Sequence, residues 1–348
     1  MGRTDCAALV EEQIRPARLM ADKQSCVDAD RAFLLARRAE WVRVACPACD
    51  VDDPRPYGEK LGFAYVECSA CGTVYTNPRP SLDLMQAFYA GSQNYAYWNR
   101  HVFPATENIR RERIFRPRAR RLAELCRGHG IAGGTLIEVG AAFGTFCQEI
   151  SEQGLFDHIV AVEPTPDLAR TCRQRGLEVL EMFVEDVPDT HPADVMAAFE
   201  VIEHLFSPQA FIDHCRRLIR PGGLLVLSCP NVRGFDVATL RMLSNTFDHE
   251  HVNYFHPASL ALLLGRCGFR VLDIQTPGQL DAELVRKHLA AGSLDLSAQP
   301  LLREILVERW DELGGPFQGF LADHQLSSHL WVVAQPGCSE EGATTDAR

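Results

Sequence analysis

The sequence predicts an α/β fold in which helices cover both faces of a mostly parallel sheet. From residue 134 onward, short apolar runs alternate with amphipathic segments, and a glycine-containing turn follows the first of these runs. This alternation is typical of strand–helix–strand units, which place parallel strands side by side. Two Cys-x2-Cys pairs precede the alternating region and indicate a separate small lobe.

The expected strands follow one another at regular spacing. The first three are "TLIEVG", "HIVAVEP" and "LEVLE", the fourth is the long "ADVMAAFEVIEHL", and the fifth is "LLVLSCPN". The helix "SPQAFIDHCRRLIRPGG" is expected to stop at its Pro-Gly-Gly. The sixth strand is "FRVLDIQTP", and "HLWVVAQP" (329–336) is the last. Helices are also expected within residues 1–40 and after Ser81, which suits an N-cap.

The bulk composition is that of a globular protein, with 46% hydrophobic and 23% charged residues. No apolar run approaches the roughly 20 residues that span a bilayer, and the first twenty residues lack the apolar core of a signal peptide. Several of the 13 cysteines lie in apolar segments, as free thiols do in a reducing compartment. We therefore expect a cytoplasmic protein.

The formal net charge of −11 argues against a nucleic-acid partner, because neutralising phosphates supplies most of that binding energy. Residues 100–121 are a local exception, with eight arginines against Glu107 and Glu112. Two interpretations remain open for this stretch. It could be the solvated face of a helix, or a dock for RNA or a phosphorylated substrate group.

The turn after the first expected strand, "EVGAAFGTF", is a poor pyrophosphate cradle. A G-x-G-x-x-G fingerprint would need glycine where Ala142 and Thr145 stand. A turn from Gly140 to Gly144 behind the acidic Glu138 better suits a ligand with a cationic amino group. At the next strand ends, Glu163 could accept both ribose hydroxyls, and Asp186, beside Phe183, could accept from an adenine amino group.

The motifs "LIEVGAAFGTF", "VAVEPTPDLA", "FVEDVP", "FEVIEHLFSP" and "LIRPGGLLVLSCPN" together resemble the class I S-adenosylmethionine-dependent methyltransferases, nearest to the ubiquinone-biosynthesis branch. The resemblance covers roughly residues 120–275 and the last strand. It implies a Rossmann-like sheet of order 3-2-1-4-5-7-6 with strand 7 antiparallel. The cofactor-binding residues that it implies are Glu138, Gly140, Ala142, Gly144, Glu163, Asp186, Phe199 and Glu200. Ala142 replaces the usual second glycine.

The acceptor is expected to bind after the fifth strand, where "FDHEHVNYFHPASL" gathers three histidines and several acids. Methyl transfer requires the acceptor to be positioned and deprotonated, and histidine is a natural base near neutral pH. We expect His256, before Pro257, to be structural, and His204 to pack behind the cofactor loop. A His-x-His metal pair is also conceivable, although no complementary ligands are evident.

"EHVNYF" also resembles a segment of sugar C-methyltransferases, which carry a cysteine-rich zinc lobe ahead of the methyltransferase domain. The resemblance implies that Glu250 and His251 deprotonate the acceptor, and His249 is a further candidate. Two departures leave the acceptor atom open: Asp248 stands where a tyrosine is expected, and "TPGQLDAELVRKH" replaces a His-Gly-Gly run. Asp281 and Arg286 are secondary candidates for substrate contact.

The four paired cysteines predict a structural zinc site. Two Cys-x2-Cys knuckles 18 residues apart fit a tetrahedral zinc ribbon, and four thiolates leave no position for water or substrate. Four unligated buried thiols are the alternative. The predicted ligands are Cys46, Cys49, Cys68 and Cys71.

These observations predict a division of the chain and a function. The expected segments are 1–40 (helical), 41–80 (zinc-ribbon lobe), 81–125 (helical linker), 126–275 (methyltransferase core), 276–328 (helical insertion) and 329–348 (last strand and a disordered tail). We expect S-adenosylmethionine-dependent methylation of a hydroxyl or carbon on a sugar or carrier-linked small molecule, with a nucleotide-linked sugar as one candidate acceptor. The alternatives are an RNA methyltransferase that binds through the ribbon and the arginines, and a non-catalytic S-adenosylmethionine-binding assembly protein.

Overall fold

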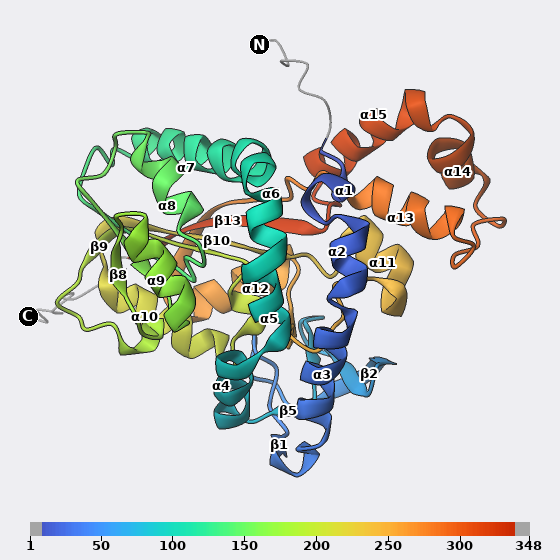
Figure 1. Cartoon of the computed structure of the whole chain (residues 1–348), viewed down its shortest axis with the longest axis horizontal. Coiled ribbons are helices and arrows are strands. Elements are labelled where there is room, and N and C mark those ends of the chain that lie inside the picture. The colour runs from blue at the N-terminus through green and yellow to red at the C-terminus, as the bar shows by residue number, and fades with distance from the viewer. Residues whose placement is uncertain (1–8, 338–348) are drawn as a thin grey trace, which may run out of the picture.

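A seven-stranded sheet forms the centre of the computed structural model, which describes residues 9–337 (Figure 1). Its order is β12-β13-β10-β9-β6-β7-β8. The strands are β6 (Thr135–Val139), β7 (His158–Val162), β8 (Glu178–Leu180), β9 (Ala193–Phe199), β10 (Ile219–Pro230), β12 (Phe269–Gln275) and β13 (His329–Pro336). Only β13 runs antiparallel to its neighbours β10 and β12. Counted from β6, this is order 3-2-1-4-5-7-6, so the predicted fold class is confirmed.

Helices cover both faces of this sheet, as the alternating pattern predicts. The helices α10 (Pro208–Leu218) and α12 (Pro257–Arg266) pack Phe211 and Leu260 into the core of one face. The helices α7 (Arg116–Gly128) and α8 (Thr145–Ser151) pack Leu122 and Phe146 into the core of the other. The helix α9 (Pro166–Gln174) follows β7. Strand β10 begins at Ile219, earlier than expected, so the Pro-Gly-Gly lies within its irregular start.

The paired cysteines belong to a second sheet of four strands in the order β11-β4-β3-β2. Three of these strands come from the cysteine segment: β2 (Pro54–Lys60), β3 (Phe63–Cys68) and β4 (Val74–Thr76). The fourth, β11 (Asn253–Tyr254), lies far along the chain and pairs antiparallel with β4. A two-residue pair, β1 (Trp41–Val42) with β5 (Arg79–Pro80), closes the segment. The second sheet therefore includes residues from within the predicted acceptor segment.

Short helices from the first third of the chain stand beside the carboxyl edge of the large sheet (Figure 1). Those from the N-terminal segment are α1 (Glu11–Ile14), α2 (Ala17–Asp22) and α3 (Gln24–Leu35), and those after the cysteine segment are α4 (Leu82–Gly91), α5 (Gln93–Tyr97) and α6 (Phe103–Arg110). The predicted cap is present, since the Ser81 hydroxyl accepts from Leu84 N at 3.3 Å. Helix α3 packs against both α4 and α5.

The arginine-rich stretch is engaged with the core more than the solvated-face interpretation expects. Arg111 and Arg116 reach the fully buried carboxylate of Glu149, at 2.8 and 2.9 Å. The guanidinium groups of Arg118 and Arg121 lie 4.4 Å from the ring centres of Phe199 and Trp331 respectively. These contacts pack the first turns of α7 against the sheet.

The chain between β12 and β13 is helical, with α13 (Asp281–Ala290), α14 (Pro300–Arg303) and α15 (Trp310–Asp323). These helices share a small core with α11 (Phe235–Leu240). No helix within residues 9–337 is long and apolar enough to cross a membrane. The predicted tail, residues 338–348, lies outside the described part of the chain.

Candidate active site

The turn between β6 and α8 takes a left-handed backbone at three of five positions. The φ angles are 71° at Gly140, 48° at Ala142 and 67° at Gly144. A Cβ on Gly144 would stand 2.3 Å from Leu177, so this position needs glycine for space as well as conformation. Ala142 adopts the same region at a cost of about 1–2 kcal/mol.

Glu163, just after β7, holds this turn in place. Its buried carboxylate accepts from Ala142 N and Thr165 N, both at 2.9 Å. Burial raises its pKa. Each oxygen uses one lone pair on the backbone and can accept one further hydrogen bond. The geometry therefore suits a ligand that offers two neighbouring hydroxyls.

Glu138 lies at the base of the same turn and is 5% exposed. Burial raises its pKa to about 8, although a hydrogen bond from Cys147 Sγ at 2.9 Å and the charge of Arg118 oppose this rise. A carboxyl group in this state would bind a cation more strongly once ionised.

The remaining predicted cofactor residues lie around the same sheet edge. Asp186 and Phe183 lie at an exposed rim. Phe199 ends β9, is buried, and packs against Phe146 and Trp331. Glu200 has a φ of 56° and accepts from the Ser228 hydroxyl at 2.7 Å. Burial opposes ionisation of Glu200, but His329 and the Ser228 hydroxyl outweigh it and hold the pKa below its usual value.

The predicted acceptor segment is a tight turn organised by Asp248. One oxygen of Asp248 accepts from the backbone N–H groups of Glu250 and His251, at 2.9 and 2.8 Å. His251 Nδ1 lies 2.9 Å from the Thr246 carbonyl, so it donates there and leaves Nε2 as the open nitrogen. His204 is close to this turn, with its ring centre 4.6 Å from that of His251.

His204 thus belongs to the acceptor cluster, which differs from the expected place behind the cofactor loop. Its Nδ1 lies 3.2 Å from the Tyr89 hydroxyl and 3.3 Å from the Glu250 carbonyl. Local sequence places His204 next to the fourth strand, but only the fold shows that residues 248–251 return to it.

Two residues that the sequence did not single out control Glu250. Asn94, at the start of α5, donates its side-chain amide to Glu250. Asp30, on α3, accepts from Ser92 Oγ at 2.6 Å and from the backbone N–H groups of Gln93 and Asn94 at 2.9 Å. Asp30 therefore fixes the start of α5, and α5 fixes Asn94. The sequence signal that was available is the polar pair Gln93 and Asn94 within the aromatic-rich "SQNYAYW".

The charges in this cluster shift the pKa values of its members. Burial and the nearby Asp248 raise the pKa of Glu250 to about 7. Burial would lower the pKa of His251, but Asp248 and Glu203 outweigh it and raise the pKa to about 9. Burial, helped by His251, lowers the pKa of His204 to about 3.

Glu203 is a third residue that the sequence analysis did not single out. It is 1% exposed, and neither carboxylate oxygen has a hydrogen-bond partner among the described residues. One ligand atom each from Glu203, His204 and His251 lie within 4.8 Å of one another. A histidine pair with a carboxylate can hold a divalent cation, and this set includes His251 of the His-x-His pair but not His249.

His249 and the other secondary candidates are placed differently. His249 is 7% exposed, and its Nε2 lies 3.7 Å from a Glu250 oxygen. Among the described residues, this Nε2 has no hydrogen-bond partner. Asp281 accepts from Ser327 Oγ at 2.6 Å, and its network ties the insertion to the loop before β13. Arg286 lies over the Trp310 ring within the insertion. Neither Asp281 nor Arg286 is a member of the acceptor cluster.

The four predicted zinc ligands converge. The sulfur atoms of Cys46 and Cys71 are 3.5 Å apart, and those of Cys49 and Cys68 are 3.4 Å apart. All four lie within 4.8 Å of one another, which matches a tetrahedral thiolate site. His256 is buried, and its Nε2 donates to the Cys71 carbonyl at 2.9 Å, which supports its structural role.

Comparisons with known proteins match part of the chain to methyltransferases. Residues 107–274 match the family model described as "Methyltransferase domain". A ubiquinone biosynthesis O-methyltransferase of Xylella fastidiosa (strain M23) is 28% identical over 170 residues, which cover 44% of this chain and 68% of that protein. One from Xanthomonas oryzae pv. oryzae (strain PXO99A) is 28% identical over 160 residues, 41% of this chain and 66% of that protein.

Two solved structures of low sequence identity are also similar. An S-adenosylmethionine-dependent methyltransferase from Clostridium acetobutylicum is 9% identical with a TM-score of 0.46, covering 69% of this chain and 99% of that one. The magnesium protoporphyrin IX methyltransferase of Synechocystis is 11% identical with a TM-score of 0.40, covering 64% and 83%.

Proposed function

Because the chain carries a class I S-adenosylmethionine-dependent methyltransferase domain at residues 107–274, we propose that it methylates a hydroxyl of a small-molecule acceptor bound against residues 248–251. The observation that carries this proposal is the partly buried Glu250 carboxylate, held by Asn94 beside His251 in the chain that follows β10. The names of the curated relatives, which are O-methyltransferases, support an oxygen acceptor. A sugar or a carrier-linked intermediate is the acceptor class that we propose.

The residues around the β6 turn fit the cofactor. The turn from Gly140 to Gly144 would face the methionine part, Glu163 would accept from the ribose hydroxyls, and Asp186 would face the adenine. Phe199 and Glu200 would adjoin the sulfonium, which supplies the methyl group. Two lone pairs remain on Glu163, and the cation-favouring Glu138 lies below the turn, which supports this assignment.

Glu250 and His251 would share the acceptor's proton chemistry. Glu250 takes the proton, since one of its oxygens is fixed by Asn94 and its side chain keeps 13% exposure toward the cluster. His251, whose raised pKa keeps it charged near neutral pH, steadies the negative charge that develops on the acceptor oxygen. His249 would act through its contact with Glu250.

A second role for the cluster is favoured by Glu203, whose two oxygens lack partners. A divalent cation held by Glu203, His204 and His251 would bind and polarise the acceptor oxygen. Treatment with a chelator and re-addition of Mg²⁺, Mn²⁺ or Zn²⁺ tests this role. Turnover that falls and returns with Mg²⁺ or Mn²⁺, which do not suit a four-thiolate site, supports this role; recovery with Zn²⁺ alone points to the cysteine cluster, and turnover that never changes rejects the role.

The cysteine cluster would hold a structural zinc ion, since four thiolates leave no open position. The RNA alternative is weakened by the pairing of Arg111 and Arg116 with Glu149, which takes them out of a phosphate-binding surface. Filter binding over a salt series would revive that alternative only if it revealed salt-dependent affinity for RNA.

The proposal is tested by Glu250→Gln and His251→Asn. Calorimetry should give both variants the same affinity for S-adenosylmethionine as the parent. A labelled-methyl screen over sugars, nucleotide sugars and phenols identifies an acceptor. Turnover on that acceptor should fall at least about a hundredfold, within the range expected for losing a general base. Unchanged turnover in both variants would remove the base assignment.

A further inference from the structure

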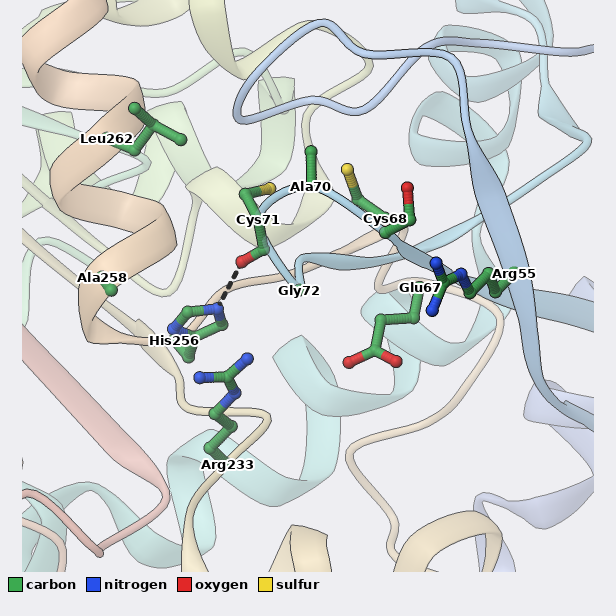
Figure 2. A pocket seen from close by; sticks show the side chains of 11 residues that line it. Arg55, Glu67, Cys68, Ala70, Cys71, Gly72, Arg233, His256, Ala258 and Leu262 are labelled. Atoms are coloured by element: carbon green, nitrogen blue, oxygen red, sulfur yellow. Dashed lines mark hydrogen bonds between the residues drawn. The ribbon is translucent and has the colours of Figure 1, made fainter.

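A groove of about 610 Å³ lies on the seam between the cysteine-bearing sheet and the loop that follows β10 (Figure 2). We call it the seam groove. The lining residues that matter here are Arg55, Glu67, Cys71, Gly72, Arg233 and His256. A second hollow of about 380 Å³ shares Glu67 and Arg233 with it and adds Tyr57 and Arg241. The two hollows meet at Glu67 and Arg233, and from here on the name seam groove covers both of them.

The seam groove is cationic on an acidic protein. Arg55, Arg233 and Arg241 line the two hollows, and Glu67 is the one acid in either lining. Among residues 9–337, none of these three guanidinium groups forms an ion pair or a hydrogen bond, unlike those of Arg111 and Arg116. Arg241 only lies over the Tyr57 ring, at 5.4 Å. Three arginines are thus available to an anion.

The Arg233 backbone is held at the wall of the seam groove. The Arg233 backbone N–H donates to Asn231 Oδ1 at 3.1 Å, and Asn231 is fully buried. The Arg233 guanidinium lies so close to Gly72 that a Cβ there would stand 2.3 Å from Nη2. Figure 2 shows the guanidinium directed toward the knuckle, beside the hydrogen bond from His256 to Cys71. The planar guanidinium fork of an arginine matches the geometry of phosphate oxygens.

The seam groove adjoins the proposed acceptor site. The Tyr57 ring centre is 5.7 Å from that of Phe247, and Phe247 immediately precedes Asp248 of the acceptor turn. Lys60, at the end of the same strand as Tyr57, donates to the Ser244 carbonyl at 2.7 Å. One buried ring therefore separates the groove from the acceptor turn.

We propose that the seam groove binds a phosphate-bearing group through Arg55, Arg233 and Arg241. The group is either the phosphorylated tail of the acceptor, which rests on the proposed function, or a separate phosphate ligand, which does not. The chemistry is the same in both cases. An acceptor that reached both Glu250 and the groove would have to pass around the buried Phe247 ring.

Calorimetric titration of pyrophosphate into the full zinc-loaded chain is the test. We expect saturable binding that weakens with salt, and a loss of about tenfold in affinity in Arg233→Gln and in Arg241→Gln, as for one charge-assisted hydrogen bond. Arg43→Gln removes an exposed arginine outside the groove and should leave the affinity unchanged. Absent binding, or equal binding in all variants, overturns the proposal.

Two further measurements separate the sources of the phosphate and the rival role of Arg233. Pyrophosphate that competes with the acceptor in methyl transfer identifies the acceptor's tail, and non-competitive inhibition identifies a separate ligand. The pyrophosphate titration does not require a methyl acceptor, so its result can be interpreted even if the screen finds none. If Arg233→Gln loses zinc while Arg241→Gln binds pyrophosphate normally, Arg233 only balances the thiolates and the proposal is wrong.

Discussion

Replacing Asp30 with alanine should damage the acceptor site from a helix that the sequence left without a role. Asp30 is 4% exposed and accepts from three donors at the start of α5. Its removal leaves two buried donors, the Ser92 hydroxyl and the Asn94 N–H, without an acceptor, because Ser92 only accepts in its bond with Tyr95 N; Gln93 is exposed to water. Each orphaned buried donor costs about 1–3 kcal/mol, so we expect a loss of about 3 kcal/mol.

Such a loss leaves the variant folded, because domains of this kind have about 5–15 kcal/mol of stability. Urea denaturation should show the lower free energy of unfolding, and calorimetry should show unchanged affinity for S-adenosylmethionine. Because Asn94 no longer orients Glu250, kcat on the acceptor found by the screen should fall at least about tenfold, the equivalent of one misplaced hydrogen bond. Asn94→Ala should reproduce the kcat loss with a smaller loss of stability.

Asp28→Ala is the matched control on the same helix. Asp28 is half-exposed and pairs with Arg31 at 3.0 Å, a surface contact that contributes about 0–1 kcal/mol. Its stability and kcat should stay near those of the parent. Full kcat in Asp30→Ala, measured on the folded fraction, would refute the link from α3 through α5 to Glu250.

Further predictions concern the cofactor turn and the cysteine cluster. Glu163→Ala should weaken S-adenosylmethionine binding at least about tenfold by calorimetry, because two hydrogen-bond acceptors are lost. Glu138 has its pKa raised to about 8, so its ionised, cation-binding form gains as pH rises; affinity should increase between pH 6 and 8, level off above, and lose this dependence in Glu138→Gln. Ala142→Gly should raise the free energy of unfolding by about 1 kcal/mol, since φ is 48°. Cys68→Ser should release zinc, measured by elemental analysis, and unfold residues 41–80 while cofactor binding survives.

The large sheet could be predicted because its information is local. Each strand is visible in the sequence as a short apolar run, and the acids at the strand ends, such as Glu163, follow directly after these runs. Once strands alternate with helices, few arrangements of a parallel sheet remain. The left-handed φ angle of Ala142 could not be predicted. The sequence shows only that alanine replaces the usual glycine, and the backbone conformation is seen only in the structure.

The support that Asn94 and Asp30 give to Glu250 could not be predicted, because these contacts join distant parts of the chain. Asn94 and Glu250 are 156 residues apart, and Asp30 lies 64 residues before Asn94. No periodic pattern encodes such a pairing. The arginine-rich stretch looked like a solvated face or an anion dock for the same reason, since its main counter-charge, Glu149, is at least 33 residues away.

The second sheet gives the cysteine lobe a part in the acceptor site. Strand β11 begins two residues after His251, and Asn253 stands opposite Tyr75 on β4, just beyond the second cysteine knuckle. The Asn253 side chain also accepts from Arg79 at 3.0 Å and donates to the carbonyl of Leu205 at 2.7 Å. The lobe and the chain around His204 are thereby fastened to the same strand. A metal that closes the knuckles would therefore stabilise the acceptor turn as well as the lobe, whereas the cofactor turn is held by Glu163, by Cys172 of α9 and by Phe103 of α6.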